Sequence, residues 1–232
     1  MFYFDPTYLL FVAPGMLLAM WASYRVKTAF AHYSQVPSEM RISGAEAAQR
    51  LLAYTGINDV TIVPTHGYLS DHYNPMTKEL ALSEEVYHGR SVAAIGIAAH
   101  ETGHALQHAH GYGPLWLRSL LVPTAGVGSS VGYIVMALGL MFHSQVMVLA
   151  GVGLFSLVLL FQIVTLPVEF NATSRAKQLV LEAGLIRPYE REGIDRVLNA
   201  AALTYVAAVV STLLVILYYL FRSGLLGGRS RE

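Results

Sequence analysis

Charged side chains are missing from three long stretches of the chain. Residues 6–24, 119–168 and 197–221 contain no Asp, Glu, Lys or Arg. Because a helix needs about 20 apolar residues to cross a bilayer, the first and third stretches each hold one such helix. The middle stretch has fifty residues and holds two, joined at the polar turn 143–145. The pattern predicts four transmembrane helices; buried helices of a soluble protein are the disfavoured alternative.

Two polar segments separate these stretches, and the first contains clear helix signals. Ser43 and Glu46 form an S-x-x-E capping box ahead of residues 44–55. Ser91 is a suitable N-cap for a second helix over about residues 92–110.

Between these two helices the pattern favours strands. Residues 60–63 form a short β-branched run that Pro64 should end. Residues 79–83 alternate, and residues 67–73 are suited to be their partner in a hairpin, with an Asn-Pro turn signal between them. The first polar segment is therefore predicted to be a small α+β unit.

The second polar segment follows the long uncharged stretch. Pro167 can kink the helix that leaves the membrane there. A helix should run from Glu169 to Leu181 and stop at Gly184, and Pro188 suits the first turn of another helix that continues into the last span.

These elements predict a mainly α integral membrane protein, with about four transmembrane helices and a small α+β cytoplasmic unit. The first span has no basic residue before it and no cleavage signal after it, so it should be an uncleaved anchor. The expected divisions are an N-terminal anchor at 1–24, an α+β unit at 25–113, a transmembrane hairpin at 114–167, a cytoplasmic helical segment at 168–199, and a C-terminal transmembrane helix with its tail at 200–232.

Composition agrees with a membrane protein and narrows the chemistry. Hydrophobic residues make up 54% of the chain and charged residues 13%, with a mean hydropathy of +0.48, whereas soluble domains carry about 25% charged residues. The net charge is zero, so nothing indicates a nucleic-acid partner. The absence of cysteine excludes disulfides and thiolate ligands, which leaves His, Asp and Glu to bind a metal.

The distribution of basic residues predicts the orientation. The two polar segments together carry eleven Lys and Arg residues, and none precedes the first span. Because basic residues favour the cytoplasmic side, both polar segments should face the cytoplasm, with both termini outside the cell membrane. Arg222, Arg229 and Arg231, near the C-terminus, favour the opposite orientation.

The strongest chemical signal is His100-Glu101-Thr102-Gly103-His104, which matches the pattern H-E-x-x-H. Residues four apart share one helix face, so His100 and His104 can bind one metal ion while Glu101 holds the attacking water. Gly103 costs about 1 kcal/mol in a helix interior, and a close approach by another element would explain it. Two ordinary histidines on a polar face are the alternative.

Catalytic zinc generally has three protein ligands, and two residues compete for the third position. His110 follows His104 at the metzincin spacing, although Gln107 stands where that pattern has a glycine. Glu169 is the first charged residue after the long uncharged stretch, which returns the chain to the side of the HETGH helix. His108 lies on the face of the motif histidines and is a bystander or an outer-sphere group. The residues alone leave the third ligand open.

Several separated motifs resemble one known family. They are Asp71-His72-Tyr73-Asn74-Pro75, the run from Leu82-Ser83-Glu84 to Tyr87, the sequence from Ala98 to Ala105, and Leu166-Pro167-Val168-Glu169-Phe170. Together they look like the bacterial YugP-like neutral zinc metallopeptidases, over nearly the whole chain and in the same order of spans. More distantly, the chain is similar to HtpX-type and CAAX-prenyl membrane proteases.

The resemblance implies a membrane zinc endopeptidase with one Zn²⁺ per chain. Since the related proteases have a glutamate ligand on a later helix, it implies that His100, His104 and Glu169 bind the zinc. The expected reaction is hydrolysis of a protein or peptide substrate, including membrane proteins, by a zinc-activated water from which Glu101 takes the proton.

Three residues depart from the related families. An aspartate is usual in the YugP-like family where this chain has Asn74 and Asn171, and HtpX-type proteases have an aspartate where Thr173 stands. These positions affect the hydrogen bonds that support a metal site, although Asn171 could still bind a ligand histidine.

The substrate-binding residues are not apparent from the sequence. His72, Tyr73 and Arg175 are each suited to stabilise the oxyanion, and each also suits an ordinary turn or surface position. The expected strand at 67–73 could bind an extended substrate along its edge.

Two rival functions use the same residues. His100, His104 and His108 repeat every four residues and resemble the histidine boxes of membrane di-iron oxidoreductases, but those enzymes need further histidine clusters that this chain lacks. A metal-stabilised scaffold without activity is the second rival. Metal identity, together with turnover of casein or a membrane protein, separates the three.

Overall fold

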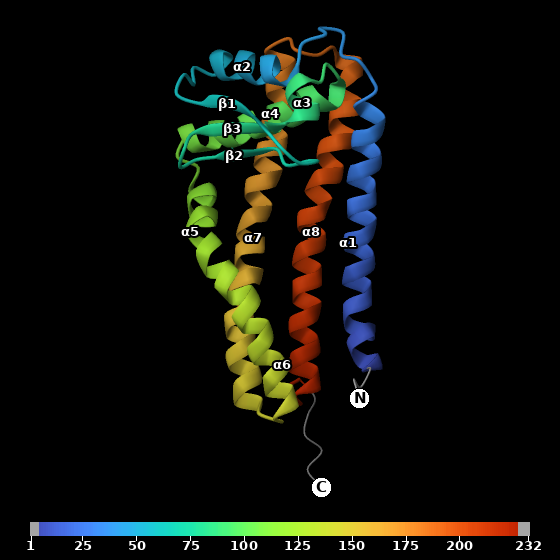
Figure 1. Ribbon diagram of the computed structural model, residues 1–232, viewed down its shortest axis with the longest axis vertical. Helices are drawn as coiled ribbons and strands as arrows, with labels where there is room; N and C mark the ends of the chain where they lie inside the picture. The colour runs from blue at the N-terminus through green and yellow to red at the C-terminus, as the bar shows by residue number, and fades with distance from the viewer. Residues whose placement is uncertain (1–4, 227–232) are drawn as a thin grey trace. The chain divides into compact units, whose positions relative to one another are not determined.

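The computed structural model describes residues 5–226 as a mainly helical protein with one small sheet (Figure 1). Its main elements are α1 (Pro6–Tyr33), α2 (Gly44–Tyr54), β1 (Thr61–Thr65), β2 (His72–Asn74), β3 (Glu79–Ser83), α3 (Glu84–His88), α4 (Val92–Ala109), α5 (Gly113–Val127), α6 (Tyr133–Met141), α7 (Gln145–Glu182) and α8 (Arg191–Arg222). A π-helical turn, Gly128–Gly132, joins α5 to α6, and a 3₁₀ turn, Pro188–Glu190, precedes α8.

The chain divides into two compact units. The apolar unit comprises Met1–Ala22, Leu117–Leu166 and Thr204–Glu232, and the polar unit comprises Ser23–Trp116 and Pro167–Leu203. Arg229 and Arg231, which entered the orientation argument, lie outside the described residues.

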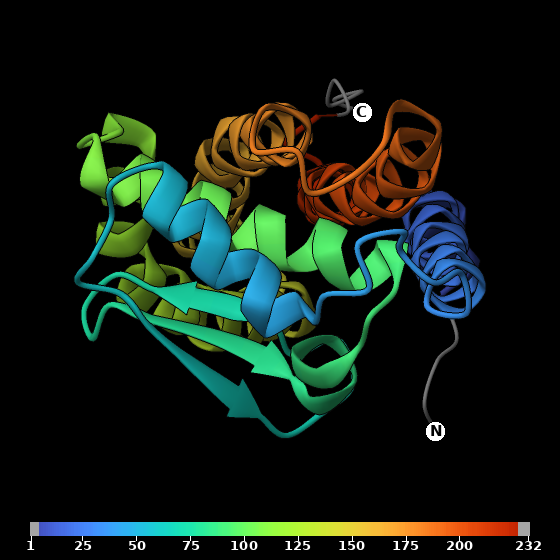
Figure 2. The same ribbon diagram turned by 90° about the horizontal axis from the view of Figure 1, so that it is seen from above.

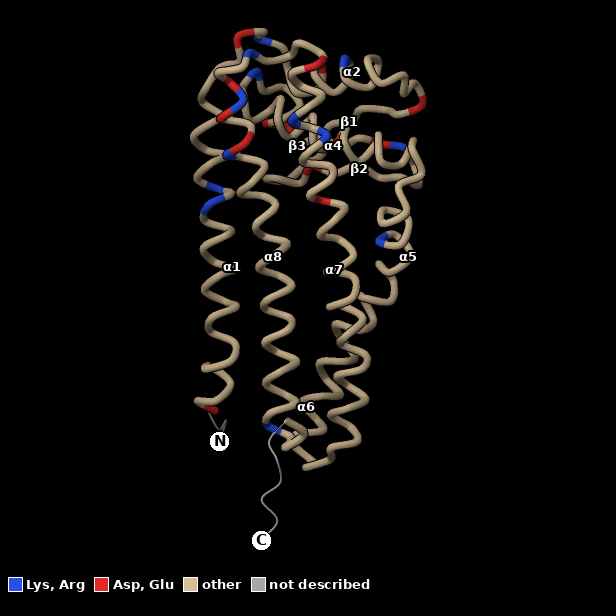
Figure 3. The backbone as a smooth tube through the Cα atoms, turned by 180° about the vertical axis from the view of Figure 1, so that it is seen from behind, with Lys and Arg blue, Asp and Glu red and all other residues tan. Residues whose placement is uncertain are grey.

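Four helical runs are long and apolar enough to cross a membrane. They are Pro6–Tyr33, Gly113–Met141, Gln145–Glu182 and Pro188–Arg222, with mean hydropathies of 1.4, 1.6, 2.5 and 2.3 over 18-residue windows. Within the described part of the apolar unit, the charged residues are Asp5, Arg118 and Arg222, so most of its backbone is tan in Figure 3. The four predicted helices are confirmed; their insertion in a membrane stays a prediction.

Glycines let the backbones of the apolar unit approach closely. A Cβ atom on Gly132 would lie 2.7 Å from the Phe155 nitrogen, and one on Gly151 would lie 2.5 Å from the Met136 nitrogen. Only glycine therefore fits where the run from α5 to α6 packs on α7. Small residues at such contacts are typical of membrane helices.

The ends of the described chain and the α6–α7 turn lie at one end of the apolar unit. Asp5 accepts hydrogen bonds from the Tyr218 hydroxyl at 2.8 Å and from Arg222 Nε at 3.2 Å. Gln145 Nε2, just after the turn, donates to the Ser223 carbonyl at 3.0 Å. Four crossings of a bilayer would require this arrangement.

The polar unit contains the sheet, in the strand order β1-β3-β2. The central strand β3 pairs in parallel with β1 and antiparallel with β2. Leu80 and Leu82 of β3 are fully buried. Figure 2 shows α2 and α4 along the same side of this sheet. The expected α+β character and the hairpin of β2 and β3 are both present.

Two strand boundaries differ from the predicted ones. β1 continues through Pro64 to Thr65, because an edge strand tolerates a residue without an N–H group. β2 begins only at His72, although we expected a strand from residue 67. Gly67 and Leu69 have φ values of 113° and 53°, and this backbone conformation does not continue a strand.

The predicted helix starts are confirmed by their caps. Ser43 Oγ accepts from the Glu46 backbone nitrogen at 3.1 Å, and the Glu46 carboxylate accepts from the Ser43 nitrogen at 2.8 Å. Ser91 Oγ accepts from the Ala94 nitrogen at 3.2 Å, at the start of α4. Local sequence therefore determines where α2 and α4 begin.

α7 passes through Pro167 as one helix of 38 residues. The chain enters the polar unit at this proline, so the C-terminal part of α7 belongs to the same unit as α4. α7 ends at Glu182, before Gly184 with its φ of 66°. Pro188 opens the 3₁₀ turn that leads into α8, as predicted.

Candidate metal centre

α4 is a buried helix that carries both motif histidines. It runs from Val92 to Ala109, and Gly111, with a φ of 61°, follows its end. His104 is 6% exposed, and the side chain of His100 is 13% exposed. The i, i+4 spacing places the two imidazoles on one face of the helix, with ring centroids 4.8 Å apart.

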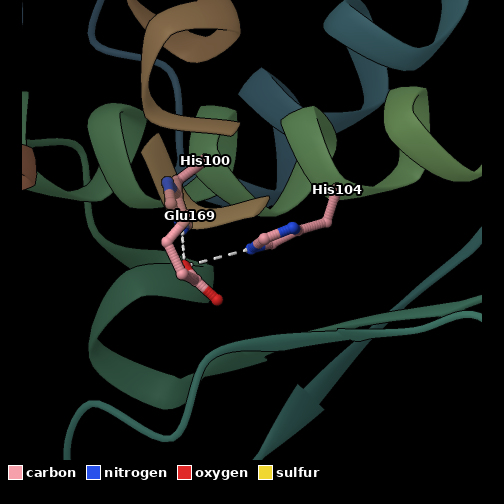
Figure 4. Close-up of side chains that lie close together, drawn as sticks. All are labelled: His100, His104 and Glu169. Atoms are coloured by element: carbon pink, nitrogen blue, oxygen red, sulfur yellow. Dashed lines mark hydrogen bonds and ion pairs between the residues drawn. The ribbon is translucent and has the colours of Figure 1, made fainter. Parts of the chain in front are cut away.

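Glu169 of α7 lies against both histidines. Its Oε2 atom is 3.2 Å from His100 Nε2 and 3.5 Å from His104 Nε2 (Figure 4). One ligand atom from each of the three residues lies within 4.8 Å of the others. Glu169 is only 1% exposed, so the three groups form a buried cluster from two helices of the polar unit.

Gly103 explains how α7 comes so close to α4. A Cβ atom at this position would lie 2.8 Å from the carbonyl oxygen of Ala172, in the backbone of α7. This distance is too short for any side chain without a backbone shift. The close approach expected from a glycine inside this helix is therefore observed, and the approaching element is the helix that carries Glu169.

The donor set fits a zinc ion. Two imidazole nitrogens and one carboxylate oxygen, with a position left for water, are the ligands of many catalytic zinc sites. His100 Nδ1 is 3.3 Å from Thr173 Oγ1, and His104 Nδ1 is 3.0 Å from Gln107 Oε1. Since the Nδ1 atoms have these partners, both Nε2 atoms are directed at the place where a metal would lie.

Glu101, the predicted general base, is also a buried residue of α4, with 6% exposure. Successive residues of an α-helix are turned by about 100°, which sets Glu101 beside the histidine face rather than within the cluster. This position suits a group that acts on a water near the metal. Its catalytic role stays a prediction.

The other two histidines of this helix end are not in the cluster. His110 is the C-cap residue of α4, and among residues 5–226 the group that could hold a metal consists of His100, His104 and Glu169. His108 Nδ1 is hydrogen-bonded to the Tyr73 hydroxyl at 2.8 Å. The geometry therefore favours Glu169 over His110 as the third ligand.

The three candidates for oxyanion stabilisation differ in their surroundings. Burial raises the pKa of Tyr73 to about 12, with a further contribution from Asp59, so its hydroxyl keeps its proton at neutral pH. His72 is exposed, and its Nδ1 is 2.8 Å from the Ser70 carbonyl. Arg175 Nε donates to Asn171 Oδ1 at 2.7 Å. No measured distance connects any of the three to the metal cluster.

Asp71 joins two of the motifs that carried the family resemblance. Its carboxylate accepts hydrogen bonds from the Ser83 backbone nitrogen at 2.8 Å and from the Ser83 hydroxyl at 3.0 Å. Burial raises the pKa of Asp71, and the bonds from Ser83 partly offset this effect. The carboxylate therefore ties the start of β2 to the end of β3.

Sequence reasoning missed the role of Gln107. It was noted only as a departure from the metzincin glycine, yet its buried amide contacts His104. Asn171 does not contact a ligand histidine, as we had considered, but the Gln107 amide at 3.0 Å. The longer Gln107 side chain, three residues after His104 on the same helix, occupies that place. This i, i+3 spacing was the signal in the sequence.

Comparison with known proteins points to the same chemistry. The family model described as "Putative neutral zinc metallopeptidase" matches residues 8–224. The chain is 45% identical to "Putative membrane protease YugP" of Bacillus subtilis over 202 residues, which cover 87% of this chain and 90% of the relative. No solved structure matches the chain. Both matches are long enough to concern the whole molecule rather than one motif.

Proposed function

The chain belongs to the family described as "Putative neutral zinc metallopeptidase", and on that premise we propose that it is a membrane-embedded zinc endopeptidase. One observation carries the proposal: the Nε2 atoms of His100 and His104 lie 3.2 and 3.5 Å from the same oxygen of Glu169. Burying a carboxylate is costly unless it is paired or coordinates a metal. A zinc ion among these three groups would satisfy all of them.

Zinc bound there would polarise the scissile carbonyl and lower the pKa of a water to about 7. Glu101 then takes a proton from the attacking water and delivers it to the leaving amine. Gln107 and Thr173 hold the two imidazoles by their Nδ1 atoms. Tyr73 retains its proton at neutral pH and is the candidate donor to the oxyanion.

We place the four apolar helices across the cell membrane, with the polar unit in the cytoplasm. The hydropathy of the four runs supports insertion. The eleven basic residues of the two polar segments support the orientation. The substrate would be a protein or peptide, including membrane proteins that reach the centre from the bilayer.

The test is metal analysis and proteolysis on the full chain, purified in detergent. We expect zinc to co-purify and casein or a membrane-protein substrate to be cleaved. A chelator should abolish cleavage, and added zinc should restore it. Iron in place of zinc would indicate an oxidoreductase. Zinc without any turnover would indicate a scaffold.

A further inference from the structure

Gln107 has three polar neighbours in a fully buried position. Its Oε1 atom is 3.0 Å from His104 Nδ1. Its Nε2 atom is 2.8 Å from the Val168 carbonyl oxygen and 3.0 Å from Asn171 Oδ1. One amide therefore connects a cluster histidine on α4 to both the backbone and a side chain of α7.

The chemistry of the neighbours allows only one orientation of this amide. The Val168 carbonyl can only accept a hydrogen bond. Arg175 Nε can only donate, so the Asn171 atom at 2.7 Å from it must be the oxygen. Both neighbours of the Gln107 amide on α7 are then acceptors, and the amide must turn its NH₂ group towards them. Its oxygen consequently faces His104.

This orientation determines which nitrogen of His104 carries the proton. Because Gln107 Oε1 can only accept, His104 Nδ1 must donate. In the neutral imidazole the other nitrogen, Nε2, is then unprotonated, with its lone pair available to a metal. Nε2 is also the atom that lies 3.5 Å from Glu169.

His100 offers a contrast within the same cluster. Its Nδ1 atom is 3.3 Å from the Thr173 hydroxyl, which can both donate and accept. Thr173 can therefore accompany either tautomer of His100, whereas Gln107 accepts only one tautomer of His104.

We propose that Arg175, Asn171 and Gln107 form a positioning relay that holds His104 in the tautomer and orientation needed to bind the metal. The relay rests on the proposed function, because it presumes that the cluster binds zinc. None of the three residues touches the substrate or the metal. Their contribution is to zinc affinity, and loss of such an outer partner typically weakens metal binding by about 10- to 100-fold.

Zinc affinity of purified variants, measured by competition with a chelator, tests the relay. Gln107→Met keeps the length of the side chain but removes its acceptor, and we expect about 10- to 100-fold weaker binding. Asn171→Asp keeps an acceptor facing both Gln107 and Arg175, and it should bind zinc as the wild type does. Asn171→Leu removes that acceptor and should weaken binding, by less than Gln107→Met because the Val168 carbonyl remains.

Two further readouts separate positioning from a purely structural tie between α4 and α7. The melting temperature of the metal-free chain reports the tie, and the visible absorption of the cobalt-substituted chain reports ligand geometry. We expect Gln107→Met to change the cobalt spectrum and Asn171→Asp to leave it unchanged. If Gln107→Met does not fold, the two Asn171 variants carry the test.

The outcomes distinguish this relay from the function on which it rests. Unchanged zinc affinity in Gln107→Met, with only a lower melting temperature, would overturn the relay and leave the peptidase intact. Equal zinc affinities of Asn171→Leu and Asn171→Asp would do the same. A wild-type chain that binds no zinc would overturn both.

Discussion

At the scale of single residues, Glu101 separates a peptidase from a metal-stabilised scaffold. Glu101→Gln keeps the size of the side chain and removes the proton acceptor. Because Glu101 lies outside the cluster of metal-binding groups, zinc content and folding should stay near normal. Loss of a general base commonly lowers the rate by about 10² to 10⁴. Proteolysis and zinc content are the measurements, and full activity in this variant would refute the mechanism.

The third ligand is a second question at the residue scale. Glu169→Ala should reduce zinc well below one ion per chain, because it removes the only carboxylate of the cluster. His110→Ala should keep its zinc, since His110 caps the end of α4 outside the cluster. Elemental analysis of the two purified variants decides. Zinc lost only from the His110 variant would move the third ligand and indicate a metzincin-like site.

At the scale of elements, the site depends on how closely α4 and α7 pack. The two motif histidines and Glu169 come from different helices, and their atoms meet only because Gly103 admits the backbone of α7. Gln107 then bridges the same pair of helices through the Val168 carbonyl. The glycine and the glutamine therefore serve one contact, one by leaving space and the other by bonding across it.

Gly103→Ala should disturb this contact. Its Cβ would lie 2.8 Å from the Ala172 carbonyl oxygen, and overpacking of this kind costs about 1–3 kcal/mol. We expect a lower melting temperature and weaker zinc binding, because α7 must move away with Glu169. Gly153→Ala is the matched control, since Gly153 lies inside α7 with no atom within 4 Å of the added Cβ. Similar effects of both substitutions would contradict the role of Gly103.

At the scale of the whole molecule, the apolar and polar units predict a division of labour between membrane and catalysis. All three residues of the cluster belong to the polar unit. In the described part of the apolar unit, two of the three charged residues, Asp5 and Arg222, are paired with each other. The apolar unit is thus suited to anchor the chain, and the orientation of the chain decides which compartment the centre serves.

A reporter fused after Arg90 should behave as cytoplasmic, and one fused after Glu232 as external. The reason is the eleven basic residues in the two polar segments, which favour the cytoplasmic side. Protease accessibility in intact cells and in inverted vesicles gives an independent measurement. The reverse pattern would place the metal centre on the outer face.

The sequence by itself determined the features that depend on neighbours along the chain. The uncharged stretches predicted four long helices, and the serines before α2 and α4 predicted where these helices begin. The spacing of His100 and His104 placed them on one face because a helix repeats every 3.6 residues. Such features follow from local geometry and from the burial of apolar side chains, so no tertiary contact is needed to predict them.

Only the tertiary structure decided what meets across the chain. The residues alone left His110 and Glu169 open, and the packing of α7 on Gly103 brought Glu169, 69 residues after His100, to 3.2 Å from it. Gln107 was read as a missing glycine until its amide was seen between His104, Val168 and Asn171. β1 runs through Pro64 because it lies at the edge of the sheet. Each of these depends on contacts between distant segments, and local sequence patterns do not encode which segments will pack together.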